Sequence, residues 1–389
     1  MPWRSVNVLD QRVEFAVRAK KGESMVGLCR EFEISRPTGY LWSKRFETDG
    51  VLGCEELSRR PQSSPSQTAE AVERAVVEER KLRPDWGARK LRVVLQNRDI
   101  HLPVPTIHRI LVRHDLIRAD NQHRPAVRRF EREQPNELWQ MDFKGPPGWN
   151  RTTGPLSVLD DHSRFALALA DHGTTKADPV RDRLQQVFSD SGVPQEMLLD
   201  HGTPWWNMRS GTGWTWLTVW LMKQNIRLLF CAFRHPQTQG KIERFHGSLQ
   251  RAVRERLPGP VEHVEQAWLD TFRHEYNHLR PHEALGMTPP AKHWHKSEKA
   301  YDRNPSWDYG EGAEVQRLTG NGQLWFNHRH WDIGWALAGE SIALVRGENR
   351  VVVYYRRTIV RELDLKTGRS LTITGEGPGH GRKARKEGS

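Results

Sequence analysis

The chain has few cysteines and no long apolar run, and these two absences exclude several classes of protein. Its 389 residues include only three cysteines, Cys29, Cys54 and Cys231. They lie too far apart for a CxxC zinc site or a disulfide framework. No stretch approaches the roughly eighteen apolar residues of a membrane span, and no opening segment resembles a signal peptide. We therefore expect a protein of the reducing cytoplasm with no membrane partner.

Negative charge is also in deficit. The chain has 60 Lys and Arg against 48 Asp and Glu, a formal net charge of +12. Residues 1–135 alone hold 26 Lys and Arg against 19 Asp and Glu. Clustered cations gain free energy by releasing counterions from nucleic acid, so this balance predicts a polyanionic partner, contacted largely by the front of the chain. The length predicts roughly two to four domains.

Residues 1–57 have the spacing of a helix-turn-helix domain. Apolar residues recur at helical intervals from Asn7 to about Phe46, and we expect Tyr40 and Leu41 to be among those that pack. Ser24 can cap one helix, and Ser35 with Pro37 can open the next. We predict that this second helix presents four residues to a DNA major groove, with Arg45 as a further candidate: Arg36, Thr38, Ser43 and Lys44. The alternative is a helical hairpin with a solvated basic face.

A second helix-turn-helix domain is predicted at residues 68–118, after a polar linker at 58–67. It begins with an Ala/Val/Glu helix, and further helices open near Trp86 and Pro105. Residues 119–135 are basic and nearly free of periodicity, which indicates a linker that lies along phosphates. The DNA contacts expected from this part of the chain are Arg89, Lys90, Arg109, Arg128 and Arg129.

The pattern then changes twice. Short apolar runs separated by helical stretches predict an α/β domain at residues 136–296. Residues 307–375 contain five predicted strands and indicate a small, SH3-like β-barrel, followed by a basic disordered tail at 376–389. The barrel has a mixed aromatic and basic set that either packs its core or grips DNA: Trp325, Trp331, Trp335, Arg317, Arg329, Arg346 and Arg350.

Three acidic residues in the α/β domain are candidates for catalysis. Asp142 interrupts an apolar strand in LWQMDF. Burying an acidic side chain costs free energy unless a partner or a metal ion compensates it. Asp200 follows the apolar strand of EMLLDHGTPW, at the edge where open α/β sheets place ligands. Glu243 lies about one turn into a helix, after the Pro/Gly-containing loop of HPQTQGKIERFHGSL. These placements allow the three carboxylates to meet.

Carboxylates that are brought together repel one another unless cations occupy the space between them. Mg²⁺, with Mn²⁺ as an alternative, is the hard cation that suits oxygen ligands. Two such ions about 3.5–4 Å apart can activate an attacking oxygen and stabilise a leaving oxygen at a phosphodiester. Each acid alone is a weak signal, but their order and flanks together are specific.

The sequence resembles the bacterial insertion-sequence transposases with a retroviral-integrase-like core, nearest to insertion-sequence families three and four-eighty-one. Five motifs carry the resemblance: LWQMDF, LSVLDDHSRF, EMLLDHGTPW, HPQTQGKIERFHGSL and YNHLRPHEALGMTPP. The resemblance extends more loosely to the two helix-turn-helix units. It implies an RNase H-like core, the acidic DDE triad Asp142, Asp200 and Glu243, and Mg²⁺ as cofactor.

One spacing departs from the simplest integrase pattern. Between Asp200 and Glu243 lie 42 residues, more than in that pattern. The excess lies at residues 205–215, WWNMRSGTGWT, a segment with the composition of an inserted loop. The four-eighty-one group often has a similarly lengthened segment, so the triad assignment stands while the contacts of this loop stay open.

Other polar residues near the triad have competing interpretations. Asp160 and Asp161 are interpreted as structural, because the resemblance and the strand pattern both favour Asp142. Lys241 and Arg244 flank Glu243 and are expected to hold DNA phosphates, the alternative being a solvated helix face. His235 and His246 orient water, bind phosphate or pack, and the metal mechanism needs neither.

These features predict a bacterial, nucleoid-associated transposase that binds terminal inverted repeats and target DNA, and that cleaves and joins strands. A transposon has two ends, so a homodimer or larger assembly on DNA is expected. Two alternatives are an inactivated DNA-binding relative and an RNase H-like nuclease that cuts without joining.

Overall fold

The computed structural model describes residues 7–56, 67–117, 131–145, 153–231, 239–257, 264–372 and 375–376. The chain divides into two compact units, Met1–Thr68 and Ala69–Ser389. Within the described residues, no helix has the length and apolar character needed to cross a membrane. The predicted contacts Arg128 and Arg129, as well as His235, lie outside the described residues.

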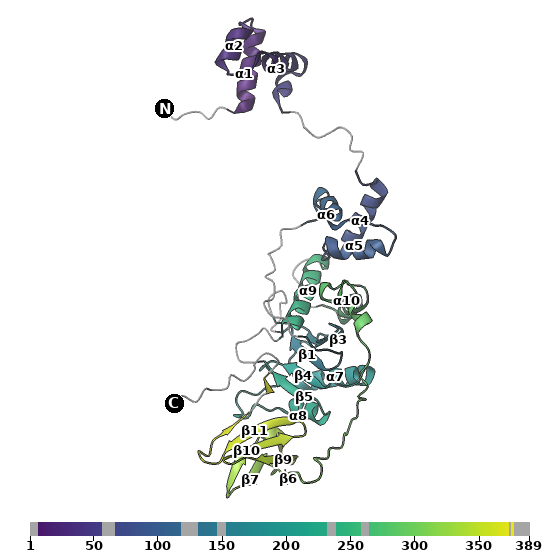
Figure 1. Ribbon diagram of the computed structural model, residues 1–389, viewed down its shortest axis with the longest axis vertical. Coiled ribbons are helices and arrows are strands. Elements are labelled where there is room, and N and C mark those ends of the chain that lie inside the picture. The colour runs from purple at the N-terminus through teal and green to yellow at the C-terminus, as the bar shows by residue number, and fades with distance from the viewer. Residues whose placement is uncertain are drawn as a thin grey trace. The chain divides into compact units, whose positions relative to one another are not determined.

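The first unit contains the predicted helices α1 (Val8–Lys20), α2 (Met25–Glu31) and α3 (Arg36–Asp49) (Figure 1). Ser24 and Ser35 cap α2 and α3 by accepting backbone N–H groups, as the sequence predicts. Phe15, Leu28 and Cys29 form the small core of this unit. The prediction that Tyr40 and Leu41 pack is wrong, because they are 61% and 53% exposed on α3.

The second unit opens with three more helices, α4 (Glu70–Leu82), α5 (Ala88–Gln96) and α6 (Val104–Arg113). Their apolar faces meet around Trp86, Leu91 and Ile107, all fully buried. The last residues of the expected linker 119–135 are bonded to the α/β domain. Arg132 donates its backbone N–H to Asp161 and pairs with Glu196, so this segment is fixed to the α/β domain.

The α/β domain is built on one twisted sheet. Its strands are β1 (Leu138–Phe143), β2 (Leu156–Asp160), β3 (Ala166–Ala170), β4 (Glu196–Leu199) and β5 (Arg227–Phe230), in the order β5-β4-β1-β2-β3. β1, β2 and β3 are antiparallel neighbours, whereas β4 and β5 run parallel to β1. The short strand β13 (Gly375–Glu376) extends the sheet beside β5, so the expected disordered tail is ordered at Glu376.

Helices cover both faces of this sheet (Figure 1). α9 (Gly240–Arg256) and α10 (Gln266–His278) pack against Leu159, Ala166 and Leu169 on one face. α7 (Ala177–Ser191) and α8 (Trp216–Lys223) pack against the other, where Trp139 and Met141 point. Because side chains alternate along a strand, Gln140 and Asp142 face the α9 side.

The C-terminal part contains the predicted strands. β6 (Glu314–Arg317), β9 (Ser341–Arg346), β10 (Arg350–Tyr355), β11 (Thr358–Asp364) and β12 (Ser370–Leu371) form a five-stranded antiparallel sheet. β7 (Gln323–Phe326) and β8 (Arg329–Asp332) form a separate hairpin. A closed SH3-like barrel stays a prediction. This sheet shares one hydrophobic core with the α7/α8 face of the α/β domain.

A buried ion cluster ties the second helical block to the α/β domain. The Asp85 carboxylate, 0% exposed, accepts hydrogen bonds from Arg256 of α9 and from Arg280 after α10. Burial raises the pKa of Asp85, but the charges of Arg280 and Arg256 overcome it and leave the pKa below its ordinary value. The Arg280 guanidinium also lies 5.6 Å from the Trp86 ring centroid. The helical block is therefore held to the catalytic-core candidate by charge pairing.

We predict that Asp85→Ala destabilises the second unit by about 3–5 kcal/mol, because it leaves two buried cations without their shared partner. Urea unfolding followed by tryptophan fluorescence measures this loss. The matched control is Arg89→Ala, which removes an exposed cation 3.5 Å from Glu283 and should change stability by less than about 1 kcal/mol. Equal losses in the two variants would contradict the assignment.

Candidate active site

Two of the predicted acids lie at the same edge of the sheet. Asp142 is the penultimate residue of β1, and Asp200 directly follows β4. β1 and β4 are parallel neighbours, with Gln140 paired to Leu198, so the two acids occupy equivalent positions where the strands end. Asp142 is 22% exposed in its side chain. This is the carboxyl edge at which open α/β sheets bind ligands.

The surroundings of Asp142 hold its carboxyl group in the protonated form to a higher pH than usual. Burial raises the pKa of Asp142 to about 7, and the negative charges of Asp200 and Glu243 contribute to the increase. The backbone N–H of Phe143 opposes it by hydrogen bonding to the carboxylate. Asp142 is thus mostly buried near like charges, whereas Glu243 is exposed at the start of α9.

Asp200 is held by groups of its own loop. Its Oδ1 accepts the backbone N–H of Gly202 at 2.9 Å and the indole N–H of Trp205. A Cβ on Gly202 would lie 2.9 Å from both carboxylate oxygens, so glycine is required for this close approach. Sequence analysis missed Trp205, although its position in EMLLDHGTPW was a signal.

Glu243 lies in the first turn of α9, and a buried polar network fixes where this helix starts. The backbone N–H of Ile242 donates to the Gln140 side chain at 3.2 Å. Gln140 in turn donates to Asp161 at 2.7 Å, and the Lys241 ammonium forms a buried ion pair with Asp161. Because Gln140 lies two residues before Asp142, this network sets the position of Glu243 relative to β1.

The same network decides the roles of Asp160, Asp161 and Lys241. Both aspartates are fully buried, and Asp160 accepts hydrogen bonds from Asn136 and Ser163, so their structural interpretation agrees with their contacts. The prediction that Lys241 holds DNA is not supported. Its ammonium is engaged with Asp161, and burial lowers its pKa to about 8 despite that attraction.

Two more titratable side chains border Asp142. His246 donates or accepts a 2.9 Å hydrogen bond at Ser157, the residue paired with Asp142 across β1 and β2, and its Nδ1 lies 4.0 Å from the Asp142 carboxylate. Burial, with the charge of Lys144, lowers the pKa of His246 to about 3, so the ring is neutral. Burial also lowers the pKa of Lys144, which sequence analysis missed because it lies outside every motif.

The donor set suits a hard cation, but the acids are not gathered into a closed metal site. Among the residues that the structure describes, no group of three His, Cys, Asp or Glu side chains is close enough to hold a metal ion. Carboxylate oxygens are nevertheless the ligands that Mg²⁺ prefers, and their mutual repulsion is what a cation would relieve.

The predicted DNA contacts on α3 divide into two groups. Arg36 and Lys44 are exposed, as expected. Thr38 and Ser43 are not free for DNA, because the Thr38 hydroxyl bonds Ser35 at 2.8 Å and the Ser43 hydroxyl is buried. Arg45 donates to the Glu55 carbonyl at 2.7 Å. The assignment of Thr38 and Ser43 to DNA stays a prediction that their surroundings do not favour.

The contacts expected from the second block and α9 are also mixed. Arg89, Arg109 and Arg244 are exposed. Lys90 is not, because it is packed beside Asp85 and Arg280, and burial with the charge of Arg280 lowers its pKa to about 7. Its assignment to DNA is therefore not supported by its surroundings.

The C-terminal aromatic and basic residues do not act as one surface. Trp331 is buried and donates its N–H to the Phe326 carbonyl at 3.0 Å, whereas Trp325 and Trp335 are 55% and 77% exposed. Arg346 and Arg350 form ion pairs with glutamates of the same sheet. Packing explains Trp331, and only the exposed tryptophans stay candidates for DNA.

Family comparisons identify the two main parts of the chain. The integrase core domain matches residues 132–236, and a second integrase core domain family matches residues 224–290. A homeodomain-like domain matches residues 38–111. The α/β domain is thus an integrase catalytic core of RNase H-like fold, and the front is a homeodomain-like helical region, both as the sequence predicts.

Curated relatives come from bacterial insertion elements. The chain is 26% identical over 239 residues to an uncharacterized 31.7 kDa protein of insertion element IS407 from Burkholderia multivorans, covering 59% of this chain and 83% of that protein. It is 30% identical over 161 residues to an uncharacterized 39.2 kDa protein of insertion element IS476 from Xanthomonas euvesicatoria. The second alignment covers 41% of this chain and 44% of that protein.

Solved structures with partial similarity are viral integrases. A simian T-cell lymphotropic virus intasome in complex with PP2A regulatory subunit B56 gamma aligns with TM-score 0.37 and 13% identity, over 72% of this chain and 96% of that chain. The HTLV-2 integrase catalytic core domain in complex with magnesium aligns with TM-score 0.32 and 15% identity, over 42% of this chain and 99% of that chain.

We predict that Asp142→Asn stabilises the metal-free protein in a pH-dependent way. A carboxyl whose folded pKa exceeds its unfolded value favours the folded state below the unfolded pKa, and this advantage is lost as pH rises to the folded pKa, here about 7. The gain over the native chain should be larger near about pH 8 than near about pH 5, by on the order of 2 kcal/mol. Urea unfolding in a chelator measures it, and a gain independent of pH would contradict the cause.

Proposed function

Because the chain belongs to the bacterial insertion-sequence transposases with an integrase core, we propose that it binds the terminal inverted repeats of such an element and cleaves and joins DNA strands there. The observation that supports this proposal is the placement of Asp142 and Asp200 at the ends of two neighbouring parallel strands, with Glu243 in the first turn of α9, which packs on the same sheet. Strand ends and a helix start thus carry three acids that are far apart in the sequence. A fold needs a functional reason to retain a buried acid such as Asp142.

We propose that Asp142, Asp200 and Glu243 bind two Mg²⁺ ions, for which Mn²⁺ can substitute. When held by these residues, such ions would activate an attacking oxygen and stabilise a leaving oxygen at a phosphodiester. The fold places the three acids at the end of β1, after the end of β4 and in the first turn of α9. His246, being neutral and bonded to Ser157, supports the backbone at Asp142 and adds no positive charge.

Cleavage and joining both replace one P–O bond by another. In cleavage, the oxygen of water attacks phosphorus, the P–O bond to the element's 3′ oxygen breaks, and a 3′-hydroxyl is released. In joining, that 3′ oxygen attacks a phosphodiester of the target and displaces its 3′ oxygen. Each step forms one P–O bond and breaks one, so no nucleoside triphosphate is needed.

We propose that α3 contacts the bases of the repeat. Its exposed face contains Arg36 and Lys44 for phosphates and guanine edges, together with the exposed apolar side chains of Tyr40 and Leu41. Apolar groups in a major groove contact the methyl group of thymine. Arg89, Arg109 and Arg244 are exposed cations that suit phosphate contacts along the second unit.

Two ends of an element must be cut and joined together, so we propose that the active assembly on DNA is a homodimer or a larger oligomer. Each copy contributes one set of three acids. Location with the bacterial nucleoid follows from this proposal, because both the repeats and the target are chromosomal or plasmid DNA.

We predict that Asp142→Ala, Asp200→Ala and Glu243→Ala each lower cleavage and joining of a terminal-repeat duplex by at least about 100-fold in Mg²⁺. DNA affinity should stay within about threefold of the native value, because the acids contact metal and not the repeat. The matched control is Asp160→Asn, a buried acid of the same domain that bonds Asn136 and Ser163 and should lower stability more than it changes the metal requirement. Gel assays of 3′ ends and joined products give both rates.

The outcomes separate the proposed transposase from its alternatives. Full activity in any one alanine variant would remove that acid from the site. A native protein that cuts and never joins would be a nuclease, and one that binds the repeat without cutting would be a DNA-binding relative. The presence of all three acids favours the transposase.

We predict that Arg36→Ala and Lys44→Ala each reduce the salt dependence of DNA binding by about one unit of slope, because each removes a contact that releases a counterion. Fluorescence anisotropy over a salt series measures the slope. Arg45→Ala is the control on the same helix, since its guanidinium donates to Glu55 and lies 4.5 Å from the Trp42 ring centroid. If Arg45→Ala lowers the slope equally, α3 binds DNA by another face.

A further inference from the structure

Both hydrogen bonds to the Asp200 carboxylate converge on one oxygen. Gly202 and Trp205 donate to Oδ1, and no described residue donates to Oδ2. A carboxylate has room for about four hydrogen-bond donors over its two oxygens. The protein therefore satisfies one oxygen with its own groups and leaves the other available to a ligand.

The indole that holds Oδ1 is itself fixed on the strand of another acid. Trp205 is 1% exposed, and its ring stacks on Phe143 with centroids 5.5 Å apart and an interplanar angle of 13°. Phe143 is the residue after Asp142. One rigid side chain thus contacts β1 beside Asp142 and the carboxylate of Asp200, so it fixes the relative position of the two acids.

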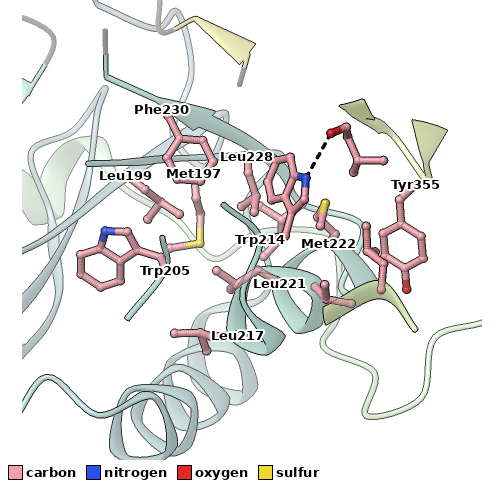
Figure 2. Close-up of a cluster of buried hydrophobic side chains, with 14 of the residues drawn as sticks. Met197, Leu199, Trp205, Trp214, Leu217, Leu221, Met222, Leu228, Phe230 and Tyr355 are labelled. Carbon is pink, nitrogen blue, oxygen red and sulfur yellow. Dashed lines mark hydrogen bonds between the residues drawn. The ribbon is translucent and has the colours of Figure 1, made fainter. Parts of the chain in front are cut away.

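The loop that supplies Trp205 is anchored by the C-terminal sheet. Trp206 packs edge-to-face on Trp214, with ring centroids 5.7 Å apart, and Trp214 donates its N–H to the Val360 carbonyl of β11 at 3.1 Å. Figure 2 shows Trp214 between Trp205 on the side of the α/β domain and Tyr355 of the C-terminal sheet. Thr372 also donates to the Thr212 carbonyl at 2.9 Å. These contacts explain the extra residues between the second and third acids.

Burial of the ring does not by itself explain the polar contact. Three other indole N–H groups, those of Trp86, Trp294 and Trp307, are buried without a partner in the described part of the chain. The Trp205 N–H instead meets a charged oxygen of a proposed catalytic residue. A hydrogen bond to a charged group is about twice as strong as a neutral one, so it can orient the carboxylate.

We propose that Trp205 is a positioning residue for metal binding: it holds Oδ1 of Asp200 so that Oδ2 is presented to the divalent ion. This inference rests on the proposed function and extends it to a residue outside the triad. The loop at 205–215 thereby links the metal-binding edge to the C-terminal sheet, which acts as its support.

The test compares Trp205→Phe with Trp214→Phe in the full chain. Each change keeps a buried aromatic ring and removes one indole N–H, at sites that are 1% and 3% exposed. Trp205→Phe should raise the Kd for Mn²⁺, measured by calorimetry without DNA, by about tenfold, the usual effect of losing a partner of a metal ligand. Cleavage should then need more Mg²⁺ by a similar factor, while DNA affinity stays native. Trp214→Phe removes one anchor of the loop and keeps the Asp200 contact, so it should raise the Kd by no more than about threefold while lowering stability.

Phe143→Leu gives a second, independent measurement. It removes the ring under Trp205 and keeps the indole N–H, so the Kd for Mn²⁺ should rise by about two- to threefold, less than in Trp205→Phe. This variant carries the test if Trp205→Phe does not fold, and a native Kd in Phe143→Leu would then overturn the proposal.

The remaining outcomes separate this inference from the proposed function. Native Mn²⁺ affinity and Mg²⁺ requirement in a folded Trp205→Phe would overturn the positioning role and leave the transposase proposal intact. Equal weakening in Trp214→Phe would overturn it too, because the effect would then be one of general stability. A native chain that neither binds Mn²⁺ nor cleaves would overturn both proposals.

Discussion

The burial of an acidic side chain, Asp142, near the carboxylate of Asp200 is the constraint on which the rest of the candidate site depends. Asp142 has a pKa of about 7 because the fold buries it and brings Asp200 and Glu243 near it. An acid whose pKa is raised by folding lowers the free energy of unfolding at neutral pH. This arrangement therefore does not serve stability. A divalent cation bound by these acids would relieve this cost, in agreement with the Mg²⁺ site proposed here.

The rest of the core holds these acids in place. Gln140, Asp161 and Lys241 form a buried network between β1 and α9, which sets where Glu243 lies. Breaking a buried ion pair leaves an uncompensated charge, so such a network resists displacement of the helix. Trp205 plays the corresponding part for Asp200. The acids themselves are few, and most of the precision comes from neighbours that never contact DNA.

The other parts of the chain are organised in different ways. The unit Met1–Thr68 has its own small core around Phe15 and Leu28, and its α3 exposes the residues proposed to contact bases. The second helical block is instead tied to the core through Asp85, and the C-terminal sheet shares the hydrophobic core of the α7/α8 face.

The sequence by itself determined the elements and the candidate acids. Alternating apolar residues around Asp142 and Asp200 predicted two strands, and the serine caps at Ser24 and Ser35 predicted α2 and α3, because these signals act between residues close in the chain. The integrase resemblance of the motifs agreed with the family comparisons.

Only the tertiary structure decided which side chains are exposed and which are engaged within the protein. The sequence favours DNA contact for three residues that the fold engages or buries instead: Lys241, Lys90 and Ser43. The exposure of Tyr40 and Leu41, and the contact of Trp205 with Asp200, follow from packing across elements. Local sequence patterns do not reveal such contacts, because burial and pairing depend on residues that meet only after the chain has folded.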